Sequence, residues 1–133
     1  MRIFLDTNVL VSAFATRGVC ADLLRSVLAE HTLVISEVVL DELTRALRTR
    51  IKMPPPLVEE IVGFLREQEV VPCPAEPSPV FIRDPADQWI LASAVDAGAD
   101  LLVTGDQDLL EIAAESPVKI VTPRTFWELS RRR

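Results

Sequence analysis

Acidic side chains next to predicted strands are the residues of this chain best suited to chemistry. Asp6 directly follows an apolar segment, Glu42 lies in the helix after the second predicted strand, Asp87 opens the helix before the fourth, and Asp106 closely follows the fourth. In an open parallel sheet, ligands bind outside the carboxyl ends of the strands, near the point where the strand order reverses. We therefore expect these four carboxylates to meet in one cleft.

Four carboxylates in one cleft are unlike a solvated acidic surface, because they repel one another. Two of them about 5 Å apart repel by about 3 kcal/mol at an effective dielectric constant near 20. Such a cluster either holds protons at raised pKa values or binds a cation, and oxygen-rich sites suit Mg²⁺ or Mn²⁺. A divalent ion activates water, orients a phosphodiester and neutralises charge on the leaving oxygen. The acids therefore predict metal-dependent hydrolysis of phosphodiester bonds, with Mg²⁺ as the default ion.

Each acid receives a role in this hypothesis. Asp6 and Asp106 are expected to ligate the metal, and Asp87 to ligate it directly or through water. Glu42 is expected to complete the acidic metal site and to position or deprotonate the attacking water. The remaining candidates are Asp84 and Asp108, as ligands of a second ion, and Asn8, Ser36 and Thr104, as hydrogen-bond partners of the carboxylates or the scissile phosphate.

Every one of these acids also has a purely structural interpretation. Aspartate is a favoured N-cap residue, and acids stabilise the first turn of a helix. The segment Asp84-Pro85-Ala86-Asp87 is typical of an N-cap, a proline at the first helical position and an acid at the third. Spacing along the chain alone does not separate this interpretation from metal binding.

Helical phase separates the acids that point inward from those that do not. At about 100° of rotation per residue, Asp87 lies on the buried face of its helix and Asp96 on the opposite side. Glu42 borders the apolar stripe of its own helix, whereas Asp41 faces away from it. Because a carboxylate on a core-facing stripe needs a partner, we prefer Asp87 to Asp84 as the third acid of the cluster.

The elements that must position these acids alternate between strands and helices. Apolar, β-branched runs predict strands at Arg2–Leu5, Thr32–Ile35, Val70–Cys73, Leu101–Thr104 and Val118–Val121. Helical patterns run roughly over Val9–Phe14, Ala21–Glu30, Glu37–Arg50, Leu57–Glu69, Pro85–Ala97, Leu109–Ala114 and Arg124–Arg131. This alternation calls for right-handed crossovers. The expected fold class is α/β, a three-layer α/β/α sandwich around a central parallel sheet of about five strands.

Length and composition indicate one globular domain spanning residues 1–133. The chain is 49% hydrophobic and 26% charged, which is ordinary for a single core. The proline-rich runs 53–56 and 72–79 are expected to be loops, and the second is too central to link two domains. The sequence shows neither an apolar run of about 18 residues nor a signal-peptide layout, so we expect a cytoplasmic protein without membrane contact.

Charge and the scarce residue types narrow the function classes. A net charge of −6 argues at first against a nucleic-acid partner. If bound cations neutralise the acids in one pocket, however, arginines elsewhere on the surface can still bind phosphates. The closing Arg131–Arg133 is one candidate for that role, or simply a solvated end. The spacing of Cys20 and Cys73 suggests neither a zinc site nor a disulfide framework. His31 is the single histidine, which argues against catalytic triads that need a histidine base. We expect His31 to end a helix.

Four pieces of the sequence, in this order, together resemble PIN-domain nucleases over nearly the whole chain. They are Asp6-Thr7-Asn8 after the opening strand, Glu42 in the helix led by Ser36, Asp87 with Ile90-Leu91-Ala92, and the segment from Gly98 to Asp106. The resemblance implies a PIN-like fold and an Mg²⁺- or Mn²⁺-dependent endoribonuclease. It also implies a VapC-like toxin of a toxin–antitoxin pair, with an antitoxin protein as partner and a homodimeric state. By the family pattern, Asp6, Glu42, Asp87 and Asp106 form the acidic quartet.

Two other functions compete with this one. An aspartate after the first strand also serves Mg²⁺-dependent phosphoryl-transfer domains, but those favour a second aspartate two residues later, where this chain has Asn8. A non-catalytic PIN-fold module that binds a partner protein is the other alternative, which the intact set of acids disfavours. A dinucleotide-binding enzyme is disfavoured because no G-x-G-x-x-G follows the first strand.

Overall fold

A parallel sheet forms the centre of the molecule. The computed structural model describes residues 1–131, so Arg132 and Arg133 of the basic end lie outside the described residues. Within that range five strands pair in the order β3-β2-β1-β4-β5, all parallel. They are β1 (Arg2–Leu5), β2 (Thr32–Ser36), β3 (Glu69–Val71), β4 (Leu101–Val103) and β5 (Lys119–Val121). The predicted parallel α/β/α fold is confirmed.

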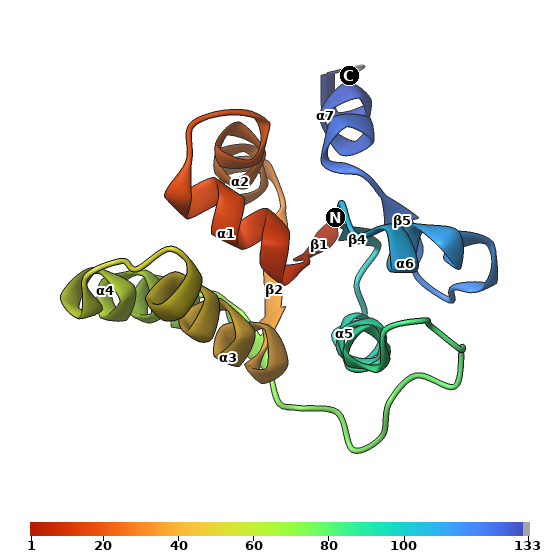
Figure 1. The fold of residues 1–133 in the computed structure, drawn as a ribbon. Helices are drawn as coiled ribbons and strands as arrows, with labels where there is room; N and C mark the ends of the chain where they lie inside the picture. The colour runs from red at the N-terminus through yellow and green to blue at the C-terminus, as the bar shows by residue number, and fades with distance from the viewer. Residues whose placement is uncertain (132–133) are drawn as a thin grey trace.

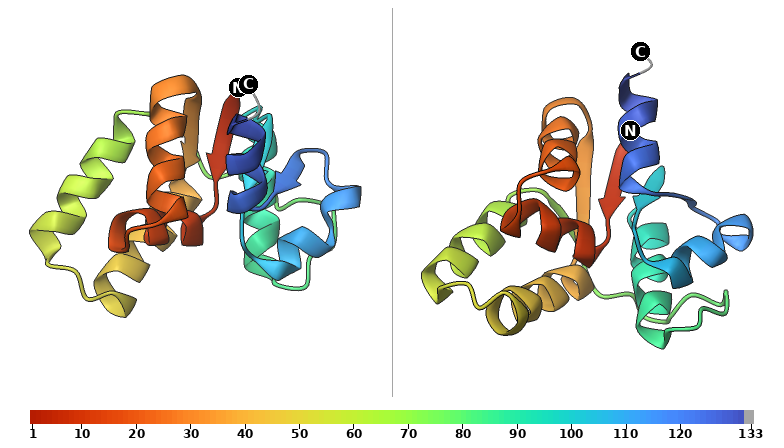
Figure 2. Two further views of the ribbon diagram at one scale, coloured as in Figure 1. Left: turned by 90° about the horizontal axis from the view of Figure 1, so that it is seen from above. Right: turned by 45° about the horizontal axis from the view of Figure 1, so that its top comes forward.

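Helices cover both faces of this sheet (Figures 1 and 2). In chain order they are α1 (Thr7–Ala15), α2 (Val19–Glu30), α3 (Glu37–Arg45), α4 (Pro55–Arg66), α5 (Pro85–Asp96), α6 (Gln107–Glu111) and α7 (Pro123–Arg131). Helices α1, α2 and α7 lie on one face and α5 on the other. Each helix within residues 1–131 is too short or too polar to span a membrane.

The strand order reverses between β1 and β4. The chain moves outward from β1 to β2 and β3, returns through α5 to the other side of β1, and continues to β4 and β5. Beside the carboxyl ends of β1 and β4, the connections therefore leave in opposite directions and open a crevice, as in other doubly wound sheets. Asp6 and Thr104, which directly follow these two strands, stand at its edge.

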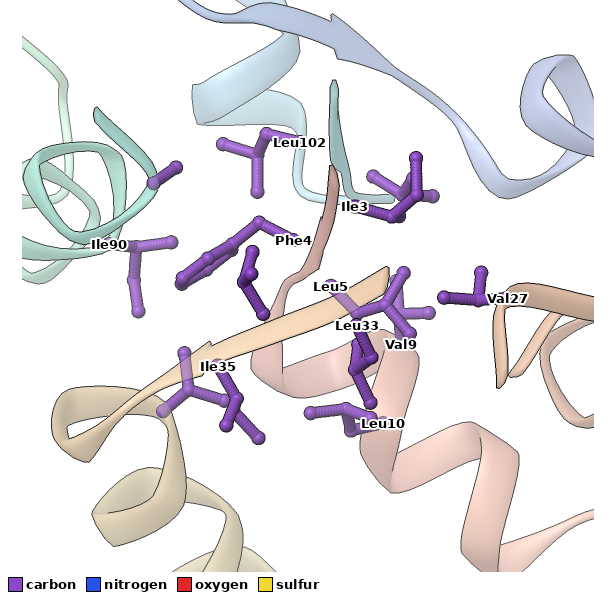
Figure 3. Close-up of a cluster of buried hydrophobic side chains, with 14 of the residues drawn as sticks. Ile3, Phe4, Leu5, Val9, Leu10, Val27, Leu33, Ile35, Ile90 and Leu102 are labelled. Carbon is purple, nitrogen blue, oxygen red and sulfur yellow. The ribbon is translucent and has the colours of Figure 1, made fainter. Parts of the chain in front are cut away.

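The alternation of side chains along β1 fixes the sheet against both helical layers (Figure 3). Phe4 points toward Ile90 of α5, whereas Ile3 and Leu5 lie on the side of α1 and α2, near Val27. All of these side chains are buried. Because each contributes about 1.5–3 kcal/mol by leaving water, β1 is held firmly and provides a rigid base for the residue that follows it.

Most element boundaries differ from the sequence prediction by one to three residues, and prolines explain some of these differences. Pro55 and Pro56 belong to the first turn of α4 and not to a loop, because a proline at the start of a helix loses no hydrogen bond. Glu69 begins β3 and does not end the preceding helix. The strand stops at Val71, because Pro72 has no N–H to donate. As predicted, His31 ends a helix, where it is the C-cap of α2.

Candidate active site

A recess of about 340 Å³ opens at the carboxyl ends of β1 and β4. Acids predicted from the sequence line it together with residues from the end of α3. The lining residues are Asp6, Thr7, Asn8, Glu42, Arg45, Ala46, Thr49, Arg50, Asp84, Ala86, Asp87 and Asp106. Folding therefore brings the four acids of the predicted quartet to one place, although they are far apart in the sequence.

Asp6 is held on both of its carboxylate oxygens. Its Oδ1 accepts a hydrogen bond from the backbone N–H of Thr7 at 2.7 Å, which caps α1. Its Oδ2 accepts one from the hydroxyl of Thr104, also at 2.7 Å. With 4% of its surface exposed and its backbone N–H donated to Val103 of β4, this carboxylate has one fixed orientation at the floor of the recess.

Thr104 connects two of the acids. Its buried hydroxyl donates to Asp6 and accepts from the backbone N–H of Asp106 at 2.9 Å. Asp106 in turn caps α6, since its Oδ1 accepts from the backbone N–H of Asp108 at 2.8 Å. The predicted partner Thr104 thus lies where it orients one carboxylate directly and the other through its backbone.

Glu42 receives its orientation from Thr7. The Thr7 hydroxyl donates to Glu42 Oε1 at 2.6 Å and so joins the first turn of α1 to α3. In the sequence, Thr7 is the middle residue of the Asp6-Thr7-Asn8 motif, for which a role was predicted only for Asp6 and Asn8. The missing signal was its position: a hydroxyl next to Asp6, in the first turn of a helix at the carboxyl edge of the sheet, is well placed to reach a second acid.

Asp87 is the acid with the least satisfied environment. It is 6% exposed, and its Oδ2 has no hydrogen-bond partner among the residues that the structure describes. Asp84, three residues earlier, is exposed and caps α5 by accepting from the backbone N–H of Ala86 at 3.0 Å. The predicted capping segment is confirmed, and helical phase placed Asp87 inward and the exposed Asp96 outward correctly.

A second group of acids adjoins the first. Oxygen atoms of Asp84, Asp87 and Asp108 lie within 4.8 Å of one another, a spacing that suits a shared cation. These include the two residues that were expected to bind a second ion. Asp87 belongs to both groups, because it also lines the recess with Asp6 and Asp106.

Burial and mutual repulsion shift the ionisation of two of these acids. Burial raises the pKa of Asp6 to about 6, to which the charges of Asp106 and Glu42 contribute, while its hydrogen bonds with Thr104 and Thr7 act in the opposite direction. Burial also raises the pKa of Asp87 to about 8, assisted by the charge and hydrogen bonding of Asp106 and by the charges of Asp6 and Asp84. Without a cation, these side chains therefore retain protons that ordinary aspartates release.

The donor set of the recess fits a hard divalent cation. It offers carboxylate oxygens from four separate parts of the chain, and one of these atoms, Asp87 Oδ2, is buried with no hydrogen-bond partner within residues 1–131. Oxygen ligands of this kind suit Mg²⁺ and Mn²⁺, and a cation would both satisfy Asp87 and offset the repulsion that raises the two pKa values.

Arginines line the recess together with the acids. The sequence-based prediction did not include them. Arg45, Thr49 and Arg50 follow Glu42 on one side of α3 and of the π-helical turn Ala46–Arg50 that continues it. The available signal was helical spacing, since these residues lie three, seven and eight positions after Glu42. Arg50 donates to Asn8 Oδ1 at 3.2 Å, so Asn8 contacts an arginine.

Ser36 lies outside this recess. Its hydroxyl is buried and caps α3 by accepting from the backbone N–H of Val39 at 3.2 Å. It thereby fixes the start of the helix that carries Glu42, and it is absent from the residues that line the recess within the described part of the chain.

A larger cavity, of about 440 Å³, lies elsewhere in the molecule. The loop 75–80 and the outer side of α5, including Val95 and Asp96, form its walls together with Pro117. Its lining residues are mostly apolar, and its two acids, Glu76 and Asp96, do not form a cluster like that of the recess. The recess at the sheet edge is therefore the candidate active site.

Comparisons with known proteins agree with this architecture. A model of the PIN domain family matches residues 2–108. No curated protein matches the chain. Among solved structures, VapBC2 from Rickettsia felis, bound to a DNA fragment from its promoter, is similar with a TM-score of 0.62 and 19% identity, over 92% of this chain and 98% of that one.

Two further structures share the fold at the same level of identity. FitAcB from Neisseria gonorrhoeae has a TM-score of 0.57 and 19% identity, over 92% of this chain and 98% of that one. The PIN domain endonuclease Utp24 has a TM-score of 0.56 and 19% identity, over 91% of this chain and 84% of that one.

Proposed function

This chain belongs to the PIN domain family, and from that premise we propose that it is a metal-dependent endoribonuclease. In this proposal residues 1–133 form one nuclease domain that hydrolyses phosphodiester bonds of RNA. The observation that carries it is the convergence of Asp6, Glu42, Asp87 and Asp106, from four separate parts of the chain, on one recess. A fold that needed these acids only as helix caps would have no reason to bury Asp87 beside them with its Oδ2 lacking a hydrogen-bond partner among residues 1–131.

Asp6, Asp87 and Asp106 are the residues that would hold the principal ion, with Glu42 beside them. Asp84 and Asp108, close to Asp87, would hold a second one. The ion is Mg²⁺, with Mn²⁺ as a substitute of similar preference for oxygen ligands. When bound, it supplies charge neutralisation at the phosphate and makes water more acidic.

The chain's own groups position the reacting parts. Glu42 accepts a proton from the attacking water, and the Thr7 hydroxyl holds its carboxylate at 2.6 Å in one orientation for that transfer. Thr104 fixes Asp6 and Asp106 relative to each other through two hydrogen bonds. The rigid pairing of β1 with β4 keeps this arrangement in place before substrate arrives.

The physiological role in this proposal is that of a toxin paired with an antitoxin protein. The fold is shared with the VapBC2 and FitAcB structures, and the motifs around the acids resemble VapC-like toxins. We further propose a cytoplasmic homodimer, for which light scattering on the purified protein is the test. A protein that stays monomeric at high concentration would contradict the dimer and leave the nuclease proposal intact.

The decisive experiment is cleavage of single-stranded RNA by the wild-type protein and by Asp6→Asn and Asp106→Asn. Asparagine keeps the shape and the capping oxygen of each residue but removes its charge, so the circular dichroism spectrum should not change. Wild-type protein should cleave with Mg²⁺ or Mn²⁺ and not with EDTA, and both variants should be inactive. Asp96→Asn, an exposed aspartate of α5, serves as the active control.

Other outcomes would refute particular parts. Cleavage that persists in EDTA would exclude the metal mechanism, and activity in both asparagine variants would exclude the residue assignment. A melting temperature that rises with Mg²⁺ in the absence of any cleavage would favour the non-catalytic, partner-binding alternative.

A further inference from the structure

The segment from Arg45 to Lys52 is the most basic stretch of an otherwise acidic chain. It contains Arg45, Arg48, Arg50 and Lys52, and no acid occurs between Glu42 and Glu59, although the net charge of the chain is −6. A cluster of cations on a protein of the opposite overall charge indicates a local function, because solubility does not require it.

The fold places this basic segment against the acidic recess. Arg45 and Arg50 line it, and the π-helical turn Ala46–Arg50 carries both the second arginine and Thr49 along its wall. Lys52 follows in the left-handed region at φ 58°, the sole non-glycine residue with positive φ among residues 1–131. Backbone departures of this kind, a π turn next to a strained residue, are frequent at functional sites.

Arg45 and Arg50 are also chemically available. Salt bridges within residues 1–131 engage Arg2, Arg25 and Arg66, and none of them involves Arg45 or Arg50. Arg50 gives one hydrogen bond to Asn8 at 3.2 Å, out of the five N–H donors of a guanidinium group. That bond orders the side chain at the wall of the recess, and both arginines are exposed to a ligand.

The burial of the acids constrains how a polyanion can reach them. Asp6 and Asp87 line the recess and are only 4% and 6% exposed, so a phosphodiester must enter the recess to contact them. Its neighbouring phosphates then pass the arginines that line the same recess.

We propose that Arg45 and Arg50 bind the backbone phosphates next to the scissile one. This inference rests on the proposed ribonuclease function and gives it two substrate-binding residues. Arginine suits the role because its planar fork contacts phosphate oxygens in pairs. Asn8 acts as a positioning residue for Arg50.

Fluorescence anisotropy of a labelled single-stranded RNA oligonucleotide tests the proposal. All proteins carry Asp106→Asn so that the oligonucleotide stays intact, and binding is followed from about 50 to 200 mM salt. Arg45→Ala and Arg50→Ala should each weaken binding roughly tenfold and reduce the slope of log K against log salt by about 0.7, the value for one phosphate contact on a single strand. Arg50→Lys should restore the slope.

Matched controls separate binding from folding and from general charge. Arg124→Ala removes an exposed arginine of α7, which does not line the recess, and should leave affinity and slope unchanged. Asn8→Ala should weaken binding in the presence of Arg50 and have little further effect on Arg50→Ala, because the two residues act as one unit.

Equal affinity and slope for Arg45→Ala, Arg50→Ala and Arg124→Ala would overturn the inference. A failure of the ribonuclease proposal looks different: protein with Asp106 intact would show the predicted binding pattern and cleave nothing. Conversely, cleavage with KM unchanged in both arginine variants would refute the arginine assignment alone.

Discussion

Thr104 and Asp6 share a hydrogen bond of 2.7 Å although 98 positions separate them in the chain. The same hydroxyl accepts the backbone N–H of Asp106, so one buried side chain determines the relative placement of two acids. Because β1 and β4 are paired neighbours in the sheet, this geometry depends on the most rigid part of the fold.

Replacing Thr104 with valine should therefore affect stability and metal binding together. Thr104→Val leaves Asp6 Oδ2 and the N–H of Asp106 without their partner, which should lower the free energy of unfolding by about 1–3 kcal/mol. It should also raise the pKa of Asp6 further, because this hydrogen bond holds it down, and so weaken Mg²⁺ binding. Urea unfolding and Mg²⁺ titration measure the two effects. Thr104→Ser, which retains the hydroxyl, should stay near wild type; identical behaviour of the valine variant would contradict the role.

Thr7 should matter for catalysis more than for binding. Thr7→Val removes the hydroxyl that orients Glu42 but keeps the backbone N–H that donates to Asp6, the N-cap of α1. We expect kcat to fall at least roughly tenfold, as for other groups that orient a catalytic residue, with KM little changed. Thr7→Ser should recover most of the activity. A change confined to KM would show that Thr7 contacts substrate and does not position Glu42.

The stability of the metal-free protein should fall as the pH rises. The folded protein keeps protons on Asp6 and Asp87 up to pH of about 6 and about 8, whereas the unfolded chain releases them near pH 4. Between these values the folded state binds more protons, so raising the pH disfavours it. In EDTA, the melting temperature should decrease from about pH 5 to about pH 8, and the stabilisation by Mg²⁺ should increase over the same window. A Mg²⁺ effect independent of pH would contradict the assignment.

Asp87→Asn should stabilise the metal-free protein while removing metal binding. The substitution eliminates a buried negative charge beside Asp106 and Asp6, which at pH 9 should raise the melting temperature in EDTA relative to wild type. The rise of melting temperature on adding Mg²⁺ should disappear. Asp96→Asn, on the exposed side of the same helix, should keep the metal response. Lower stability of Asp87→Asn in EDTA would mean that the carboxylate has a structural partner.

The sequence predicted strands and site residues correctly where a local pattern determines which face of an element a residue occupies. Apolar runs located every strand, because strands buried on both faces are almost uninterrupted in hydrophobicity. Helical phase correctly set Asp87 inward and Asp96 outward. The parallel order of the sheet then placed Asp6 and Asp106 at one edge, since both closely follow the carboxyl end of a strand.

Local sequence patterns do not predict which side chains of different elements contact one another. The bond from Thr7 to Glu42 depends on how α1 crosses α3, and no periodicity encodes that angle. Arg45 and Arg50 reach the recess on a π-helical turn, for which propensities give no rule. Prolines misled in one place: Pro55 and Pro56 are as compatible with the first turn of a helix as with a loop.

The central position of β1 between β2 and β4 has a consequence for synthesis on the ribosome. A nascent chain presents Asp6 and Glu42 early, but β1 lacks one of its two neighbours, and Asp6 lacks Thr104, until β4 has been translated. The full set of four acids therefore cannot meet before that point. For the proposed ribonuclease, this order means that a chain still in synthesis cannot cleave RNA until its fourth strand has emerged.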